Sequence, residues 1–103
     1  MIKVKVTKKC ISVLGHADYD DYGKDIVCAS VSSIITTCVN CIMNIDSEAI
    51  MYNDDGKIIT ITKRNLNNTV DIILNTMVEM LKDLETTYKK NIKIESEEWK
   101  CYF

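Results

Sequence analysis

The feature of this sequence that most constrains its fold is a long apolar segment, from Asp25 to Ile45, which contains neither glycine nor proline. Its apolar residues recur at spacings of three and four, the period of one helix face. β-branched residues lower its helix propensity, but its length favours a buried helix over a strand. The chain must then supply an apolar surface against which this helix can pack. The stripe consists of Val27, Val31, Ile34, Ile35, Cys38, Ile42 and Ile45.

A second helix is predicted over residues 70–84, where a clean apolar stripe faces acidic residues and Lys82, and Thr69 is placed to cap it. Alternating or β-branched runs around the two helices predict strands, and Asn53 to Gly56 is a strong turn signal between two of them. The resulting order, β-β-α-β-β-α-β, predicts an α/β (α+β) fold in which two helices pack on one face of a mostly antiparallel sheet. The predicted strands cover residues 2–6, 10–14, 47–52, 57–63 and 91–95.

Length and composition limit the classes of protein to which the chain can belong. A chain of 103 residues predicts a single domain, 1–103. Its net charge is −2 and no basic cluster stands out, so we expect no direct nucleic-acid partner. We judge no apolar run long enough to cross a bilayer, and the N-terminus alternates like a strand rather than a signal peptide. A cytoplasmic protein without a membrane partner is therefore expected.

The cysteines and the histidine bear on redox and metal chemistry. Five cysteines, an odd number, in a chain that looks unexported predict reduced thiols rather than a disulfide framework. Cys38 and Cys41 form a CxxC, but it lies deep in the predicted helix, whereas redox CxxC motifs lie at a helix start. A single histidine also disfavours zinc. We expect no metal and no cofactor, and a redox or metal role for the CxxC stays the weakest alternative.

The residues best suited to catalysis lie in the segment from Gly15 to Cys28. His16 follows a predicted strand, and Cys28 falls in the first turn of the long helix. The free N–H groups and the positive dipole end of a first turn favour a thiolate, and a nearby imidazole can take the thiol proton. Gly15 and Gly23 bound the acidic loop between the two residues and are candidate hinges. This pattern indicates a cysteine nucleophile with a histidine base.

Each of these residues also has a purely structural interpretation. Cys28 can be an ordinary cysteine buried in the helix. His16 can be a structural residue whose hydrogen-bonding need is met by a backbone carbonyl. Asp25 can cap the helix, which we favour, or orient His16 as the acid of a triad does. Ser32, one turn beyond Cys28, can donate to the thiolate or position substrate. Its hydroxyl can equally bond the carbonyl four residues earlier.

The segment Gly15-His16-Ala17, followed by Gly23-Lys24-Asp25-Ile26-Val27-Cys28-Ala29-Ser30-Val31-Ser32, resembles the signature of the ribosomal-processing cysteine protease family, Prp. The resemblance implies a small bacterial endopeptidase with Cys28 as nucleophile and His16 as base. It implies that the substrate is the N-terminal extension of a large-subunit ribosomal protein, cleaved after an aromatic residue in a short apolar motif. It also implies a homodimer and a mobile loop over the cleft, while the roles of Asp25 and Ser32 are less settled.

In this mechanism the free amides at the helix start would stabilise the oxyanion of the tetrahedral intermediate. The alternative is a non-catalytic, ribosome-associated protein that only holds an apolar peptide in the same cleft. Binding alone requires neither His16 nor Cys28, so the presence of both residues favours the peptidase.

Overall fold

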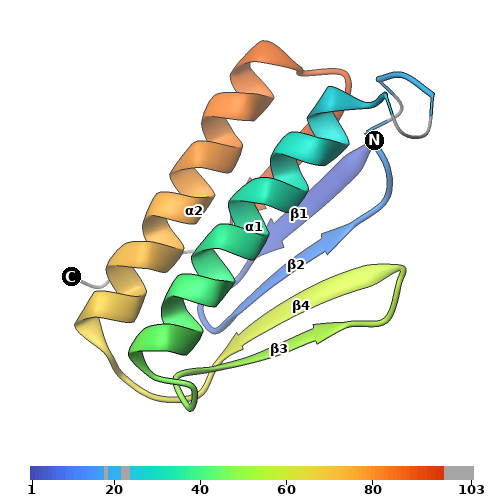
Figure 1. The fold of residues 1–103 in the computed structure, drawn as a ribbon. Coiled ribbons are helices and arrows are strands. Elements are labelled where there is room, and N and C mark those ends of the chain that lie inside the picture. The colour runs from blue at the N-terminus through green and yellow to red at the C-terminus, as the bar shows by residue number, and fades with distance from the viewer. Residues whose placement is uncertain (18, 22–23, 97–103) are drawn as a thin grey trace.

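A computed structural model describes residues 1–17, 19–21 and 24–96 of the chain. Its five strands form one sheet in the order β3-β4-β2-β1-β5, with α1 and α2 lying side by side on one face (Figure 1). Three neighbouring pairs are antiparallel and only β1 and β5 are parallel. The predicted α+β fold and element order are confirmed. The elements are β1 (Ile2–Val6), β2 (Cys10–Leu14), α1 (Ile26–Ile45), β3 (Ile50–Asp54), β4 (Ile58–Lys63), α2 (Asn68–Thr87) and β5 (Ile92–Ser96).

The core lies between the sheet and the two helices. Strand β1 shows how the sequence directs it there: Ile2, Val4 and Val6 are buried, while Lys3 and Lys5 are exposed on the other face. This alternation is the period-two pattern of a sheet that is covered on one side. The helices contribute complementary stripes at helical spacing, with Val27, Val31, Ile35, Cys38, Val39 and Ile42 buried on α1 and Val70, Leu74, Met77, Val78 and Leu81 on α2.

The starts of α2 and β3 differ from those predicted. The cap of α2 is Asn67, whose side chain accepts a hydrogen bond from the Val70 amide at 3.2 Å, and Thr69 lies inside the helix. Strand β3 begins at Ile50 rather than at residue 47. The chain first turns after α1, where the Asp46 carboxylate accepts a hydrogen bond from the Glu48 amide at 2.9 Å.

Helix α1 corrects one expectation from the sequence. With 20 residues and a mean hydropathy of 1.9, it is long and apolar enough to cross a membrane by length and composition alone. In the structure it packs against α2 and the sheet, and a third of the apolar stretch is buried there (Figure 1). Core helices of globular domains meet the same length and hydropathy criterion.

Gly15 follows β2 and fixes how the chain leaves the sheet. Its φ is +90°, in the left-handed region, and a Cβ there would lie 2.5 Å from the Met1 carbonyl oxygen. Gly56, in the β3–β4 turn, has a similar φ of +88° but open space around the same position. Both turns therefore need glycine for backbone conformation, and only Gly15 needs it for space.

These two glycines give a matched test. We expect Gly56→Ala to lower the free energy of unfolding by about 1 kcal/mol, the cost of a left-handed L-residue. Gly15→Ala adds the clash with Met1 and should cost more than about 2 kcal/mol. Urea denaturation of the two variants measures the difference. Equal losses would contradict the close approach at Gly15.

Candidate active site

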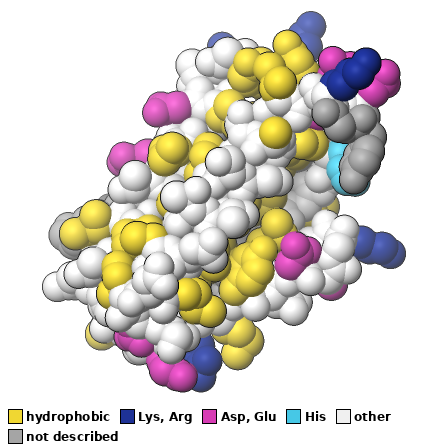
Figure 2. All heavy atoms as spheres, viewed as in Figure 1, with side chains coloured by type: hydrophobic (Ala, Val, Ile, Leu, Met, Phe, Trp, Pro, Cys, Tyr) yellow, Lys and Arg dark blue, Asp and Glu magenta, His cyan; other side chains and the backbone are white. Residues whose placement is uncertain are grey.

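His16 and Cys28 line one hollow of about 280 Å³ between the end of β2, the start of α1 and the β3–β4 hairpin. The sequence predicted that these two residues would meet, and the structure brings both to this hollow. Ser32 lines it from the next turn of α1, and Asp54 and Lys57 line it from the hairpin. A space-filling view shows apolar side chains along the depression between α1 and the hairpin (Figure 2). The hollow therefore combines polar groups at one end with an apolar floor.

Cys28 lies in the first turn of α1 and is half-buried. Its Sγ accepts a hydrogen bond from the Ala17 backbone amide at 3.3 Å. Ala17 itself is 1% exposed, so this N–H is held in place by the core. A backbone donor fixed by the core therefore lies directly beside the sulfur.

Asp25 is the N-cap of α1, and its carboxylate joins the helix to the preceding loop. One oxygen accepts hydrogen bonds from the amides of Val27 at 3.0 Å and Cys28 at 2.9 Å. The other accepts from Tyr19 at 3.0 Å and Asp20 at 3.5 Å. These hydrogen bonds lower the pKa of Asp25 below its ordinary value of 3.8, and the bond from the Cys28 amide has the largest effect. Desolvation of the carboxylate raises the pKa, but by less than the Cys28 bond lowers it.

Capping by Asp25 alters the predicted oxyanion site. The sequence suggested that free amides at the helix start would stabilise the oxyanion, but two of these amides, Val27 and Cys28, already donate to Asp25. Asp25 makes no hydrogen bond to His16 among the described residues, so its observed role is the cap that the sequence favoured over the orienting acid. The amides of Val27 and Cys28 are therefore not free oxyanion donors in this structure.

The other predicted site residues have different surroundings. The His16 imidazole is exposed and, within the described part of the chain, has no hydrogen bond to Cys28. Ser32 is exposed, and its hydroxyl bonds none of the described residues; the bond to the carbonyl four residues earlier is made by Ser30 instead, to Ile26 at 2.7 Å. The Ser32 hydroxyl is thus available to a ligand. Gly23, the second candidate hinge, lies outside the described residues.

Asn91 belongs to this site, and sequence reasoning missed it. Its side-chain amide donates to the Ala17 carbonyl at 2.9 Å, and its own carbonyl accepts from the Ile2 amide at 2.8 Å. Asn91 therefore ties the peptide beside Cys28 to the edge of β1. Nothing in the sequence signals this contact, since the two partners are 74 residues apart.

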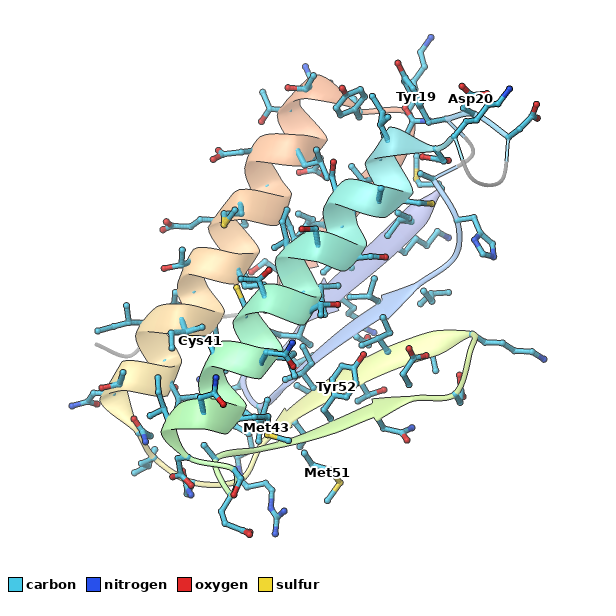
Figure 3. The ribbon with its side chains drawn as sticks, in the orientation of Figure 1. Tyr19, Asp20, Cys41, Met43, Met51 and Tyr52 are labelled. Atoms are coloured by element: carbon cyan, nitrogen blue, oxygen red, sulfur yellow. The ribbon has the colours of Figure 1, made fainter. Side chains whose placement is uncertain are left out.

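Tyr19 anchors the same loop from its other side. Its ring packs edge-to-face on that of Tyr88, which follows α2, with centroids 5.4 Å apart. Figure 3 shows Tyr19 and Asp20 beside the start of α1. The loop is therefore held at the Asp25 carboxylate, at the Tyr88 ring and at the Asn91 amide.

The CxxC has the features of ordinary helix cysteines. Cys38 is buried and Cys41 is exposed. Burial raises the pKa of the Cys38 thiol, and the neighbouring Cys41 raises it further. Both effects oppose thiolate formation at Cys38, so redox activation of this pair has no support in its surroundings.

A thiol at a helix start and an imidazole on one hollow are the groups that a cysteine peptidase uses. Comparison with known proteins gives the same class. The family described as "Cysteine protease Prp" matches residues 1–93. The ribosomal processing cysteine protease Prp of Staphylococcus aureus is 40% identical over 83 residues, which are 78% of each chain. Its namesake in Mycoplasma genitalium is 27% identical over 101 residues, covering 96% of this chain and 99% of that one.

Solved structures agree with this assignment. The S. aureus protease with a covalently linked product peptide superposes with a TM-score of 0.83 at 32% identity, over 93% of this chain and 97% of that one. The S. aureus protease in complex with a substrate peptide gives 0.78 at 29% identity, with the same coverage. The chain belongs to the Prp family of cysteine proteases.

The cap predicts a pH dependence of stability. Because hydrogen bonds lower the pKa of Asp25 in the folded state, its carboxylate stabilises the fold above the ordinary value of 3.8. This contribution is lost as the pH falls through the lowered pKa. The difference in unfolding free energy between wild type and Asp25→Asn should be constant above about pH 5 and shrink below about pH 4.

Urea denaturation between pH 2.5 and 6 measures this difference. Asp21→Asn is the control, because the Asp21 carboxylate accepts no hydrogen bond from the described residues of the same loop. A difference that stays constant down to the lowest pH would contradict the role of the ionised cap.

The Asn91 contact predicts slower chemistry at Cys28. Asn91→Ala removes the hydrogen bond that fixes Ala17, so the N–H directed at Sγ becomes less constrained. Loss of about 1 kcal/mol of interaction corresponds to roughly fivefold slower alkylation of Cys28 at neutral pH. Mass spectrometry after iodoacetamide treatment measures the rate at each cysteine. The exposed helix residue Asn40, changed to Ala, is the control, and an unchanged rate of Cys28 alkylation in Asn91→Ala would exclude the effect.

Proposed function

We propose that this enzyme removes the N-terminal extension of a bacterial large-subunit ribosomal protein, with Cys28 as the nucleophile and His16 as the base. The observation that carries the proposal is the shared hollow, which is lined both by the half-buried thiol of Cys28 and by His16. The curated relatives are named ribosomal processing proteases, and an S. aureus relative was solved with a covalently linked product peptide. A covalent peptide adduct is the kind of species that a cysteine nucleophile forms.

The reaction follows from the groups present. His16 takes the proton of Cys28, and the thiolate attacks the scissile carbonyl to give a tetrahedral oxyanion. The C–N bond then breaks as His16 returns the proton to the leaving amine. Water, deprotonated by His16, hydrolyses the thioester and releases the new carboxyl end and the free thiol. No cofactor or metal is needed.

The Ala17 amide is a candidate donor to the oxyanion. Among the described N–H groups it is the one that bonds Sγ, at 3.3 Å, whereas the amides of Val27 and Cys28 are held by Asp25. An N–H next to the sulfur lies close to the carbon that the sulfur attacks. Such a fixed donor stabilises charge that develops in the transition state. Ser32, on the same hollow, would position the peptide.

The depression between α1 and the hairpin suits an extended apolar peptide. Ile59 lines the hollow, and Tyr52 is 37% exposed farther along β3. Figure 3 shows Tyr52 and Met51 on opposite sides of β3, as strand alternation requires, and Met51 is 55% exposed. An aromatic ring at this position offers contact area to apolar substrate side chains. Cleavage beside an aromatic residue in an apolar motif fits this surface.

The remaining expectations extend the proposal. We propose that 1–103 acts as a single domain, that two copies form a homodimer in the cytoplasm, and that no membrane takes part. The segment between Gly15 and Gly23 would open to admit the peptide and close during the reaction.

Peptide cleavage tests the assignment. Wild type should cleave a peptide copying the ribosomal extension, and Cys28→Ala should reduce kcat by at least ~10³-fold. Mass spectrometry of the products gives the rate and the cleaved bond. Cys41→Ala, which removes an exposed thiol from the same helix, should keep activity within about twofold, the range of a neutral surface substitution.

Two outcomes would overturn the proposal in different ways. Retained turnover in Cys28→Ala would remove Cys28 as nucleophile. Cleavage of a composition-matched scrambled peptide at the same rate would remove the ribosomal extension as the specific substrate and leave a general peptidase.

A further inference from the structure

A second cavity, of about 390 Å³, lies at the end of the sheet away from Cys28. Four cationic side chains line it, together with Asn65, Leu66 and one carboxylate, Asp71. The protein as a whole carries a net charge of −2, so this concentration of positive charge is local. We call the cavity the basic pocket. Its cations are Lys8, Lys9, Lys63 and Arg64.

The pocket is created by strand pairing. Lys8 and Lys9 form the turn between β1 and β2, and the pair Lys63-Arg64 ends β4 more than fifty residues later. The antiparallel register of β2 and β4 places Cys10 opposite Thr62. The Lys63 amide then donates to the Lys9 carbonyl at 2.8 Å. Two short basic pairs that are inconspicuous in the sequence thus become neighbours. The expectation of no nucleic-acid partner rested on the lack of a basic cluster along the chain, and it does not take account of this cluster formed by strand pairing.

Part of this charge is already compensated. Lys63 forms an ion pair with Asp71 at 3.1 Å, and both side chains are largely buried, with 15% and 8% exposed. Lys8 and Lys9 are exposed, and neither has an ion-pair partner among the described residues. The floor of the pocket is therefore a neutral Lys63–Asp71 pair, and the two exposed lysines, Lys8 and Lys9, supply the positive charge that can bind an anion.

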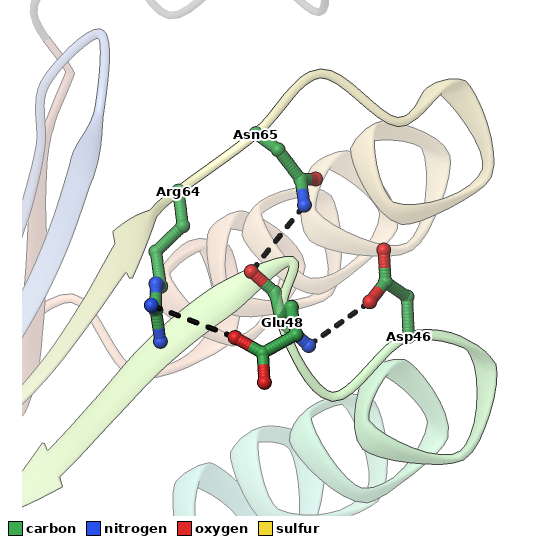
Figure 4. Close-up of polar contacts among 4 residues, drawn as sticks. All are labelled: Asp46, Glu48, Arg64 and Asn65. Atoms are coloured by element: carbon green, nitrogen blue, oxygen red, sulfur yellow. Dashed lines mark hydrogen bonds and ion pairs between the residues drawn. The ribbon is translucent and has the colours of Figure 1, made fainter.

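Arg64 is held at the side of the pocket by a small polar network (Figure 4). It pairs with Glu48 at 3.5 Å, while Asn65 donates to the Glu48 carbonyl at 3.4 Å and the Glu48 amide donates to Asp46 at 2.9 Å. The Arg64 and Glu48 side chains are 46% and 74% exposed, so this ion pair is weak and can exchange for a stronger anion.

We propose that the basic pocket binds the phosphate of a nucleotide, either free or within an RNA strand. Several cations converge on one cavity, which favours an anion of more than one charge or a chain of charges over a single carboxylate. Leu66 lines the same cavity and is 99% exposed. A solvent-exposed leucine beside the cations offers an apolar contact to the sugar or base attached to a phosphate.

The basic pocket is separate from the proposed active site. The two lie at opposite ends of β2, and the four intervals between its five residues, at about 3.3 Å each, place those ends roughly 13 Å apart. A ligand in the pocket therefore leaves Cys28 and His16 free. The proposal does not depend on the identity of the peptide substrate.

The experiment compares two double variants of the full chain. Lys8→Ala/Lys9→Ala removes two cations from the pocket, and Lys3→Ala/Lys5→Ala removes two exposed cations from the outer face of the adjoining strand. Binding of a fluorescent hexauridylate RNA is measured by anisotropy at several salt concentrations. Loss of two phosphate contacts should weaken binding about tenfold and reduce the salt slope by about 1.4, while the control keeps both near wild type. Peptide cleavage should be unchanged in both variants.

Amide chemical shifts distinguish the sources of phosphate. Titration with uridine monophosphate, inorganic phosphate and the RNA should shift the amides of Lys8, Lys9 and Arg64 before others. Shifts with the monophosphate or phosphate but not the RNA would assign a free ligand. Equal weakening in the control variant, no shifts at the pocket with any of the three, or tighter binding of an acidic peptide would each overturn the proposal.

Discussion

The active-site end of the molecule depends on one carboxylate. Asp25 accepts four backbone hydrogen bonds, two from the start of α1 and two from the loop after β2. Without such an acceptor the first amides of the helix would lack partners. The same contacts set the distance between the loop that carries His16 and the turn that carries Cys28. The stability of the helix start and the geometry of the site therefore both depend on this one side chain.

A second set of contacts joins this region to the sheet. Ala17 is the centre: its amide bonds the sulfur of Cys28 and its carbonyl is bonded by Asn91. Asn91 in turn accepts from the first residue of β1. The arrangement links Ile2, Ala17, Cys28 and Asn91 through successive hydrogen bonds, so the N-terminal segment is joined to a residue near the end of the chain. Gly15 makes it possible, since a side chain at that position would meet the Met1 carbonyl.

Local signals in the sequence predicted most of the elements but not their lateral order. The apolar stripe of α1 and the Asp55-Gly56 turn act over short distances, and both elements formed as expected. The parallel pairing of β1 with β5, and the position of β2 between β1 and β4, involve strands far apart in the chain. The start of α2 shifted because two cap candidates, Asn67 and Thr69, lie within two residues of each other, and β3 starts later because the chain first turns at Asp46.

The sequence by itself determined the chemical groups and their local supports: a thiol in a first helical turn, an imidazole after a strand, and an acid positioned to cap. These follow from periodicity and propensity, which depend on neighbours along the chain. Only the tertiary structure decided that the first-turn amides of Val27 and Cys28 are occupied, that Asn91 supports Ala17, and that two basic pairs meet beside Leu66. Each of these depends on strand register or on a hydrogen bond between distant residues, and neither leaves a periodic signature in the sequence.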